Sequence, residues 1–319
     1  MNLFDDNFGL MIFAGREFSF SDIQRLPVVL RRDPSGPWGI KPVITQADPF
    51  LFVRGDELYL FFEHQRAGEP GRIAMMKTRD LQTWTEPVIV LQEPFHLSFP
   101  HVFEDGGKVY MIPETQAADS VRLYCADGND LSHFTLCRTL LSRKRTPHVS
   151  YSFSDSHVWH QDGLYYLFTS FCVNWKYSLE LYVAENLEEG TFRRHPSSPI
   201  CTDNEYGRCA GSLIAHDGEL FRVSQDCHAA YGANVSVMRV KTLSPDSYAE
   251  ELADRNIFRV SGGEQPVSDA TLKSVAVGTG VHQLSIVRFL DRYVYSTDYK
   301  TPRFHWYQKY SALKRLLRR

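Results

Sequence analysis

Several signatures are absent from this 319-residue sequence. No apolar run approaches the roughly 20 residues that a membrane-spanning helix needs, and residues 1–6 lack the basic and apolar stretches of a secretory signal. The patterns GxxxxGK[ST], strand-linked GxGxxG, GxSxG and HExxH do not occur. These absences argue against phosphate-loop and dinucleotide binding, a nucleophile-elbow hydrolase and an HExxH metal site. We therefore expect a cytoplasmic protein without cofactor or catalytic metal.

Cysteines are few and scattered. None forms a CxxC pair, and no histidine lies at zinc-finger spacing, so a structural zinc site is not expected. Without an export signal, we expect reduced and mostly buried thiols. The six cysteines are Cys125, Cys137, Cys172, Cys201, Cys209 and Cys227.

Charge is nearly balanced in total but unevenly distributed. The chain has 35 basic and 38 acidic residues, and six of the basic ones lie in 303–319, which has no acid. The acidic remainder argues against a nucleic-acid partner. In 303–319, Trp306, Tyr310, Leu313 and Leu317 recur at helical spacing, which predicts a short basic amphipathic helix. This tail suits either an anionic inner-membrane surface or docking on the acidic body.

Aromatic residues, 13% of the chain, alternate in short runs that indicate strands. One pattern recurs, in which an apolar strand meets a Gly/Asp turn and a second aromatic strand follows. The turn glycines Gly55, Gly107, Gly163 and Gly218 are spaced by 52, 56 and 55 residues. The five hairpins are 47–63, 98–114, 152–170, 209–226 and, in weaker form, 281–298.

Most hairpins precede a third apolar strand, and a fourth is expected near Trp84 and Phe134. Units of about 50 residues with four strands are typical of propeller blades. We therefore predict an all-β, five-bladed propeller over 47–302, with a tandem of small β-domains as the less favoured alternative. The proline-rich segment 1–46 is expected to be extended and to close the ring by pairing with the last blade. The expected third strands are 72–76, 121–124, 179–183 and 235–240.

The free ends of these hairpins should gather around the propeller axis. Paired carboxylates of this kind flank the reacting carbon in glycosyl chemistry, one acting as acid and the other as base or nucleophile. The alternative is that each carboxylate only caps a turn. The polar residues at these ends are Asp48, Glu63, Glu114, Asp155, Gln225, Asp226, His282 and Asp298.

A second set of candidates lies in the fourth hairpin. Arg208 and Arg222 in an acidic pocket would suit an anionic group such as phosphate, whereas an Arg–Asp pair between neighbouring blades is the alternative. We expect eight residues to contact substrate: Arg208, Arg222, Gln225, Asp226, Tyr231, His101, Asp155 and His282.

The motifs ADPFLF…LFFE, FHLSFPHVFEDGGKVYMIPET, RCAG…ELFRVSQD…YG and LSPDSYAEE resemble one propeller family over roughly Asp33 to Glu251. It is the N-terminal domain of plant glucosamine inositolphosphorylceramide transferases, with bacterial homologues near glycan-assembly genes. Wider relatives are the five-bladed glycoside hydrolases of families 43, 32 and 62. In the family 43 pattern an Asp-Pro aspartate is the base, which the resemblance assigns to Asp48. Pro100-His101 stands where a second Asp-Pro is expected, a departure that disfavours a hydrolase.

The sequence thus predicts a glycosyltransferase that builds a bacterial surface glycan. Asp48 would be the nucleophile or base, and Glu114 or Glu63 the partner carboxylate. Arg208 and Arg222 would bind the phosphate of an activated sugar donor, and the acceptor would be a glycan or glycolipid. The alternatives are a glycoside hydrolase acting on furanosides or oligosaccharides, and a glycan-binding module without activity.

Overall fold

The structure is a computed structural model that describes residues 5–34, 42–128, 130–143, 151–174, 176–260 and 278–303. Regular structure in these ranges consists of β-strands and two 3₁₀ turns, η1 (Ile23–Arg25) and η2 (Gln116–Ala118). The helix expected in 303–319 lies, apart from Arg303, outside the described residues, so it stays a prediction. No helix in the described ranges is long and apolar enough to cross a membrane.

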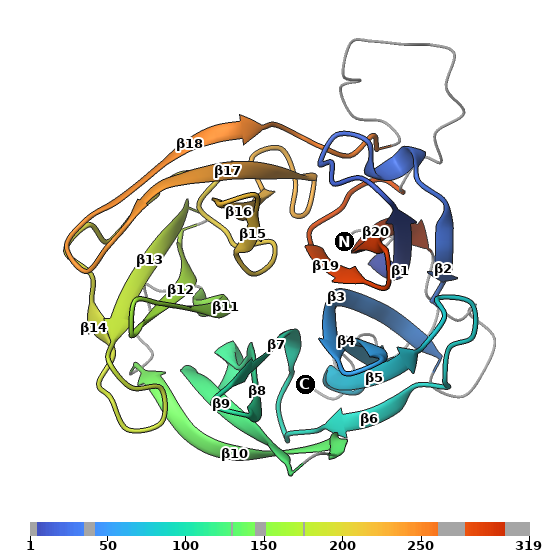
Figure 1. Cartoon of the computed structure of the whole chain (residues 1–319), viewed down its shortest axis with the longest axis horizontal. Helices are drawn as coiled ribbons and strands as arrows, with labels where there is room; N and C mark the ends of the chain where they lie inside the picture. Colours follow the sequence, from blue (N-terminus) through green and yellow to red (C-terminus); the bar gives the residue numbers. More distant parts are fainter. Residues whose placement is uncertain are drawn as a thin grey trace, which may run out of the picture.

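Four β-sheets surround a central axis, and β3, β7, β11, β15 and β19 lie nearest to it (Figure 1). Three sheets have four strands each. The first contains β7 (Ser98–Asp105), β8 (Lys108–Glu114), β9 (Ser120–Asp127) and β10 (Asp130–Ser142). The second contains β11 (Tyr151–Gln161), β12 (Leu164–Val173), β13 (Lys176–Ala184) and β14 (Arg193–Arg194). The third contains β15 (Ile214–His216), β16 (Glu219–Asp226), β17 (Asn234–Leu243) and β18 (Tyr248–Asp254).

The fourth sheet has eight strands and joins the first repeat to the last. Strand β1 pairs with β20 along its whole length and touches β3 through a single parallel pair, Phe8 with Thr45. The N-terminal segment therefore supplies two strands to the sheet of the last repeat. Where five separate blades are expected, the structure shows three separate sheets and one joined sheet. Its strands are β1 (Asp5–Gly15), β2 (Val28–Arg32), β3 (Val43–Arg54), β4 (Glu57–Arg66), β5 (Arg72–Thr78), β6 (Val88–Leu91), β19 (Leu284–Phe289) and β20 (Arg292–Arg303).

The outer strand of the first repeat differs from the expectation. Trp84 lies in a loop, and the fourth strand, β6, begins four residues later at Val88. The Oδ1 atom of Asp80 accepts the backbone N–H groups of Gln82 (2.8 Å) and Thr83 (2.7 Å). This Asx-type turn holds the backbone in a tight bend and delays the strand.

The thiol expectation is wrong for one pair, because Cys125 and Cys137 form a disulfide between β9 and β10. Thr135 pairs with Cys125, and an irregularity between Leu136 and Arg138 brings the two cysteine Cα atoms to 5.9 Å. That separation is within the usual range for a disulfide. The free cysteines are Cys172, Cys201, Cys209 and Cys227.

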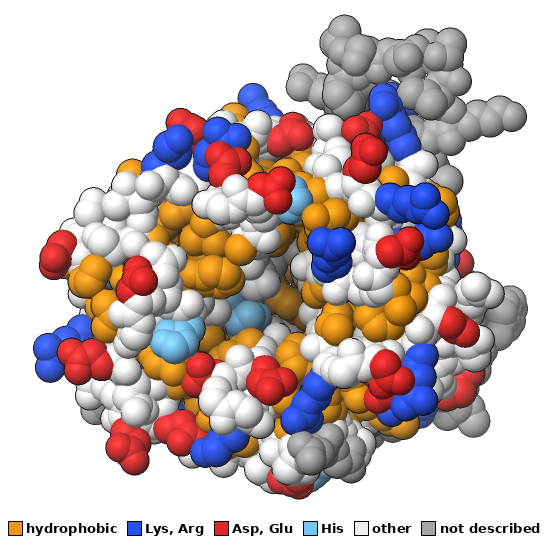
Figure 2. All heavy atoms as spheres, viewed as in Figure 1, with side chains coloured by type: hydrophobic (Ala, Val, Ile, Leu, Met, Phe, Trp, Pro, Cys, Tyr) orange, Lys and Arg blue, Asp and Glu red, His pale blue; other side chains and the backbone are white. Residues whose placement is uncertain are grey.

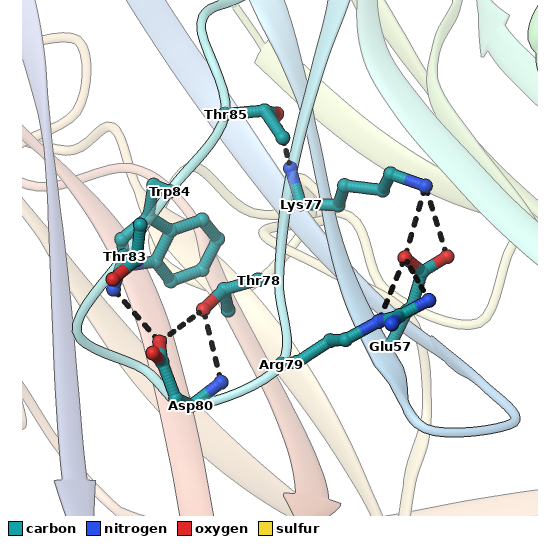
Figure 3. Close-up of a pocket in the computed structure, with 8 residues that line it drawn as sticks. All are labelled: Glu57, Lys77, Thr78, Arg79, Asp80, Thr83, Trp84 and Thr85. Carbon is teal, nitrogen blue, oxygen red and sulfur yellow. Dashed lines mark hydrogen bonds and ion pairs between the residues drawn. The ribbon is translucent and has the colours of Figure 1, made fainter.

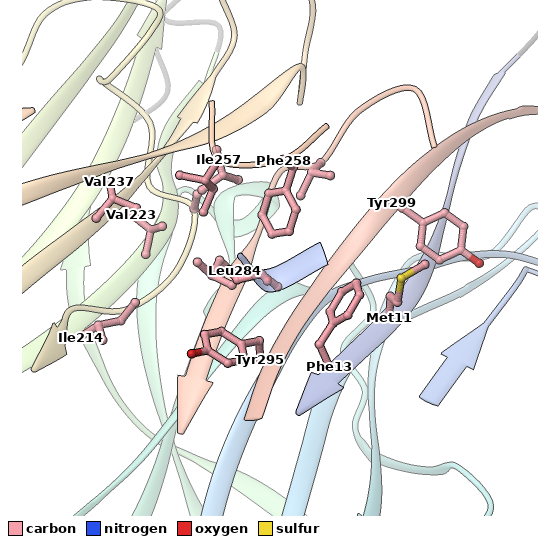
Figure 4. Packing of buried hydrophobic residues seen from close by; sticks show 14 of the residues in the cluster. Met11, Phe13, Ile214, Val223, Val237, Ile257, Phe258, Leu284, Tyr295 and Tyr299 are labelled. Carbon is pink, nitrogen blue, oxygen red and sulfur yellow. The ribbon is translucent and has the colours of Figure 1, made fainter. Parts of the chain in front are cut away.

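Apolar side chains fill the spaces between neighbouring sheets. Figure 4 shows the cluster in which Met11, Phe13, Leu284 and Tyr295 from the joined sheet meet Val223 of the third four-stranded sheet. Gly211 makes this contact possible, since a Cβ atom there would lie 2.2 Å from the carbonyl oxygen of Leu284. Close packing of this kind fixes how each sheet is placed around the axis.

The innermost strands of the first three repeats each contain a β-bulge in their first half. Asp48, Phe99 and Asp155 have φ angles of 51°, 46° and 51°, and the pairing register shifts at each of them. Bulges bend a strand and redirect its side chains, and they are common beside functional sites. The three bulges therefore lie in the parts of β3, β7 and β11 that approach one another near the axis.

Candidate functional site

Five carboxylates from different strands meet near these bulges, and we call them the central acid group. Each is 8% exposed or less. They share one neighbourhood although they are up to 250 residues apart in sequence. The members are Asp48 on β3, Glu63 on β4, Glu114 on β8, Asp155 on β11 and Asp298 on β20.

Three of these carboxylates hold the backbone of the next repeat, one within the joined sheet and two across to the neighbouring sheet. Oδ2 of Asp298 accepts the N–H of Asp48 at 3.1 Å, and Oδ2 of Asp48 accepts the N–H of Phe99 at 3.1 Å. Oε2 of Glu114 accepts the N–H of Asp155 at 3.2 Å. The capping role considered for these residues is therefore present. These hydrogen bonds use Oδ2 of Asp48 and Oε2 of Glu114. The second carboxyl oxygen of each residue, Oδ1 or Oε1, is not used by them and could take part in proton transfer.

Two cations neutralise part of this charge. The Nε atom of Arg208 contacts Oδ2 of Asp155, its Nη2 lies 4.0 Å from Oε2 of Glu114, and its Nη1 donates to the Tyr177 hydroxyl at 3.1 Å. His282 contacts Asp298 through Nδ1, and its Nε2 lies 3.7 Å from Oδ1 of Asp48. For Arg208, the structure thus shows the Arg–Asp pair between neighbouring sheets.

Glu63 has a different partner, the imidazole of His96. The backbone N–H of Gly71 donates to Nδ1 of His96 at 3.0 Å, so the ring carries its proton on Nε2, which lies 3.5 Å from Oε1 of Glu63. Gly71 is required here, because a Cβ atom would lie 2.7 Å from the imidazole and 2.9 Å from the Glu63 carboxyl. Burial lowers the pKa of His96, which favours the neutral ring.

Burial gives these acids unusual proton affinities. It raises the pKa of Asp48 to about 7, even though the positive charge of His282 opposes the shift. It raises the pKa of Glu63 to about 8 and that of Glu114 well above the ordinary value. Burial alone lowers the pKa of His282, but the carboxylates of Asp298 and Asp48 raise it to about 9. At neutral pH the site therefore holds a protonated carboxylic acid, Glu63, beside a carboxyl that exchanges its proton, Asp48.

A metal ion has one possible set of ligands among the described residues. Donor atoms of Asp48, His282 and Asp298 all lie within 4.8 Å of one another. Without an ion, the carboxylates of Asp298 and Asp48 raise the pKa of His282 to about 9, so a metal ion would have to displace a proton from this imidazole. The contacts therefore describe an ion-paired imidazolium between two carboxylates.

The predicted substrate residues of the fourth hairpin separate into two groups. Tyr231 lies beside the central acid group, with its ring 4.9 Å from the Arg208 guanidinium and 5.4 Å from the His282 ring. Gln225 is buried, and its backbone N–H donates to the Arg208 carbonyl at 2.9 Å. Asp226 lies further out, where it lines a neighbouring cavity.

Arg222 and His101 lie apart from these contacts. The fully buried guanidinium of Arg222 forms two hydrogen bonds with Glu250, at 2.8 and 2.6 Å. His101 packs 6.0 Å from the His157 ring, with Nε2 3.2 Å from the Val158 carbonyl, and burial lowers its pKa to about 4. Neither residue contacts the central acid group in the structure, so their roles in substrate binding stay predictions.

Two residues at the site carried no usable signal in the sequence. Tyr177 holds Arg208 through its hydroxyl, and Phe8 stacks on His282 with ring centroids 4.3 Å apart. Tyr177 precedes an expected third strand in a chain rich in aromatic residues, and Phe8 lies in the N-terminal segment, outside the repeated hairpins. The pairing of β1 with β20 is what brings Phe8 to the site.

The surface is hollowed at the centre of the ring of sheets, where histidine and hydrophobic side chains line the depression (Figure 2). A separate pocket of about 340 Å³ surrounds Trp84 (Figure 3). There, Glu57 forms ion pairs with Lys77 at 3.0 Å and Arg79 at 3.2 Å. The carboxylate of Asp80 accepts the backbone N–H groups of the turn that follows it. The polar groups of this pocket thus satisfy one another, which indicates a structural network.

The shifted pKa values of the buried side chains predict how the free energy of unfolding depends on pH. Above pH 6.5, folded Asp48, Glu63 and His282 retain protons that the same groups release when unfolded, because their folded pKa values are raised to about 7, 8 and 9. Below pH 6.5, buried His64 and His101, with pKa values of about 4, act in the opposite direction. The free energy of unfolding is therefore expected to fall from pH 6.5 to pH 9 by at least about 1.4 kcal/mol, the equivalent of one pKa unit.

Urea denaturation at pH 6.5, 7.5 and 9 checks this expectation. The Glu63→Gln variant removes one of the titrating groups, so its stability should decline less steeply over the same range. A free energy of unfolding that stays constant or rises towards pH 9 would contradict the raised pKa values of these three groups.

Comparison with solved structures defines the class of fold. The chain resembles a family 117 glycoside hydrolase from Zobellia galactanivorans, with a TM-score of 0.53, 12% identity, and coverage of 80% of this chain and 84% of that one. It also resembles a thermostable family 43 glycoside hydrolase, with a TM-score of 0.50, 15% identity, and coverage of 84% and 92%. The expectation of an all-β propeller is confirmed by this likeness, which at such low identity concerns the fold alone.

Sequence comparison gives the family. Residues 39–270 match the family described as glucosamine inositolphosphorylceramide transferase 1, N-terminal, and the chain belongs to it. It is 35% identical over 241 residues to glucosamine inositolphosphorylceramide transferase 1 of Arabidopsis thaliana, covering 69% of this chain and 30% of the relative. The protein of the same name from Oryza sativa subsp. japonica is 34% identical over 212 residues, covering 64% and 27%. The chain thus spans under a third of the length of these relatives, and the resemblance seen in the sequence is confirmed.

Proposed function

We propose that this chain catalyses glycosyl transfer at the central acid group. The observation that supports it most is that one buried cluster holds both Glu63, whose pKa of about 8 keeps it protonated at neutral pH, and Asp48, whose pKa is about 7. An acid and a base with separated proton affinities are what cleavage and formation of a glycosidic bond need. Membership in a family described as part of a transferase, on a propeller fold that glycoside hydrolases use, supports the same reaction.

The residues divide the proton transfers between them. Glu63, or Glu114 in its place, gives a proton to the leaving oxygen as the bond from the sugar to the donor phosphate breaks. Asp48 takes the proton of the acceptor hydroxyl as the new bond forms, through Oδ1, the oxygen that does not hold the Phe99 N–H. The proton count balances, because one carboxyl gives a proton and the other receives one.

The guanidinium of Arg208 would bind the phosphate of the sugar donor. Arg208 lies at the edge of the cluster with its side chain 12% exposed, and it can turn its guanidinium from Asp155 towards a phosphate oxygen. We propose a phosphate-activated sugar as donor and a glycan or glycolipid of surface-glycan assembly as acceptor. We also propose that the joined eight-stranded sheet represents two blades, which would give five in all.

The likeness of the fold to glycoside hydrolases favours a second candidate reaction, in which water takes the place of the acceptor hydroxyl. The same acid and base would act, and the donor would be a furanoside or an oligosaccharide. A third candidate is a glycan-binding module, favoured by the match to under a third of the plant transferases and by the use of the carboxylates as backbone caps.

An assay of product formation separates these candidates. The chain is incubated with UDP- and GDP-activated hexoses and hexosamines, together with an inositol-phosphate glycan or a lipid-linked sugar, and the products are followed by mass spectrometry. We expect a product extended by one sugar. Release of free sugar from p-nitrophenyl arabinofuranoside or xyloside, without extension, would establish hydrolysis instead. No turnover of any donor would contradict the proposed enzyme.

A further inference from the structure

A cavity of about 500 Å³ lies next to the central acid group, and the proposed proton transfers make no use of it. Its walls come from the segment that follows β16, the segment that follows β18 and the part of β20 around Lys300. Small side chains, Ala229, Ala230 and Ala233, leave the space open. The volume is of the size that holds a small organic ligand.

Tyr231 forms the boundary between the cavity and the central acid group. It lines the cavity and is 41% exposed, and its ring lies over the Arg208 guanidinium at 4.9 Å. Its backbone carbonyl accepts a hydrogen bond from Nζ of Lys300 at 3.1 Å, which fixes the position of the segment. A ligand that reaches from the acids into the cavity would pass along this aromatic ring.

The polar lining fits an uncharged ligand rich in hydroxyl groups. Among the described lining residues, the acids Glu205 and Asp226 balance the cations Arg255 and Lys300, and Glu205 binds Arg255 at 2.5 Å. The Oδ1 atom of Asn256 is buried, and no donor among the described residues contacts it. An unpaired buried acceptor is costly, and Asn256 lines the cavity, so a turn of its side-chain amide towards the cavity would let a ligand hydroxyl group satisfy this oxygen.

An exposed aromatic ring, an unpaired amide oxygen and a carboxylate together form a surface that suits a sugar. The ring contacts the apolar face of a pyranose, and the amide and the carboxylate bind its hydroxyl groups. We infer that this cavity binds a neutral sugar unit of the acceptor, next to the donor sugar at the central acid group. The role as acceptor site rests on the proposed function, whereas the binding itself can be measured without any donor.

The test measures binding of neutral disaccharides to the full chain in the absence of donor. Saturation-transfer NMR with cellobiose, maltose and α-1,2-mannobiose selects the best ligand, and titration gives its dissociation constant. Tyr231→Ala and Asn256→Leu should each weaken binding at least tenfold. Asp48→Asn with Glu63→Gln should leave it within about twofold, since these residues lie outside the cavity. Tyr293→Ala, which removes a tyrosine near the opposite ends of the strands, is the matched control.

The outcomes distinguish this inference from the proposed reaction. Loss of binding in the two cavity variants, with retention in the acid-group variant, supports a sugar site in the cavity even if no transfer is ever seen. Retention in both cavity variants, loss in the acid-group variant alone, or no binding of any of the three disaccharides overturns it. Thermal unfolding of each variant shows whether it is folded, and the exposure of Tyr231 makes its truncation a small change to the core.

Discussion

Replacing Asp48 with Asn is expected to lower kcat of the transfer reaction by about 10³-fold, within the range found for loss of a general base. The substitution removes the charge and the proton acceptor but keeps the shape. Asparagine tolerates the positive φ of 51° at this position, and its side-chain oxygen can still accept the N–H of Phe99. The fall should therefore appear in kcat, with KM for the donor changed only a few fold.

The measurement is steady-state kinetics on whichever donor and acceptor the product assay identifies. Glu57→Gln is the matched control, because Glu57, like Asp48, is an ion-paired carboxylate on a strand of the joined sheet, but it lies at the pocket of Figure 3, away from the axis. Its kcat should stay near that of the parent. If Asp48→Asn turns over at the parent rate while Glu57→Gln is unaffected, Asp48 is a capping residue and not the base.

The convergence of the central acid group could be predicted from sequence because it depends on a repeat. Four of the five hairpins share a glycine turn and all five have nearly the same length, so residues about 50 apart reach equivalent places. The placement of Asp48 and Glu114 follows from this regularity. The bulges could not be predicted, because a single residue such as Phe99 leaving the ladder has no compositional signature. Yet these bulges decide which carboxylate oxygen meets which N–H.

The ion-pair partners of the two arginines could not be predicted from the sequence. Arg208 and Arg222 both lie in the fourth repeat, and the sequence predicts both of them equally as phosphate ligands. Arg222 instead pairs with Glu250 of β18, a strand whose register against β17 contains two irregularities. Arg208 pairs with Asp155 of the neighbouring sheet. The difference depends on which sheet each guanidinium meets, and only the three-dimensional packing decides it.

Arg208→Met is expected to destabilise the fold by about 3–5 kcal/mol, the usual cost of removing one partner of a buried ion pair. The side chains of Arg208 and Asp155 are 12% and 7% exposed, so the carboxylate of Asp155 would be left buried without its cation. The double variant Arg208→Met, Asp155→Asn should recover part of this loss, since it removes the charge that Arg208 neutralises. Asparagine also suits the φ of 51° at position 155.

Urea denaturation of the parent, the single variant and the double variant at pH 7 gives the three free energies of unfolding. Arg194→Met serves as the control, because Arg194 binds Glu180 at 2.7 Å with its side chain 50% exposed, and such pairs contribute less than about 1 kcal/mol. If Arg208→Met costs no more than Arg194→Met, the cluster does not depend on this ion pair for its stability. Arg208 would then be free to leave Asp155 for a donor phosphate at little cost in folding. A loss of the expected size means instead that a donor phosphate must replace Asp155 as the ion-pair partner of the guanidinium, so that Arg208 keeps a negative partner throughout.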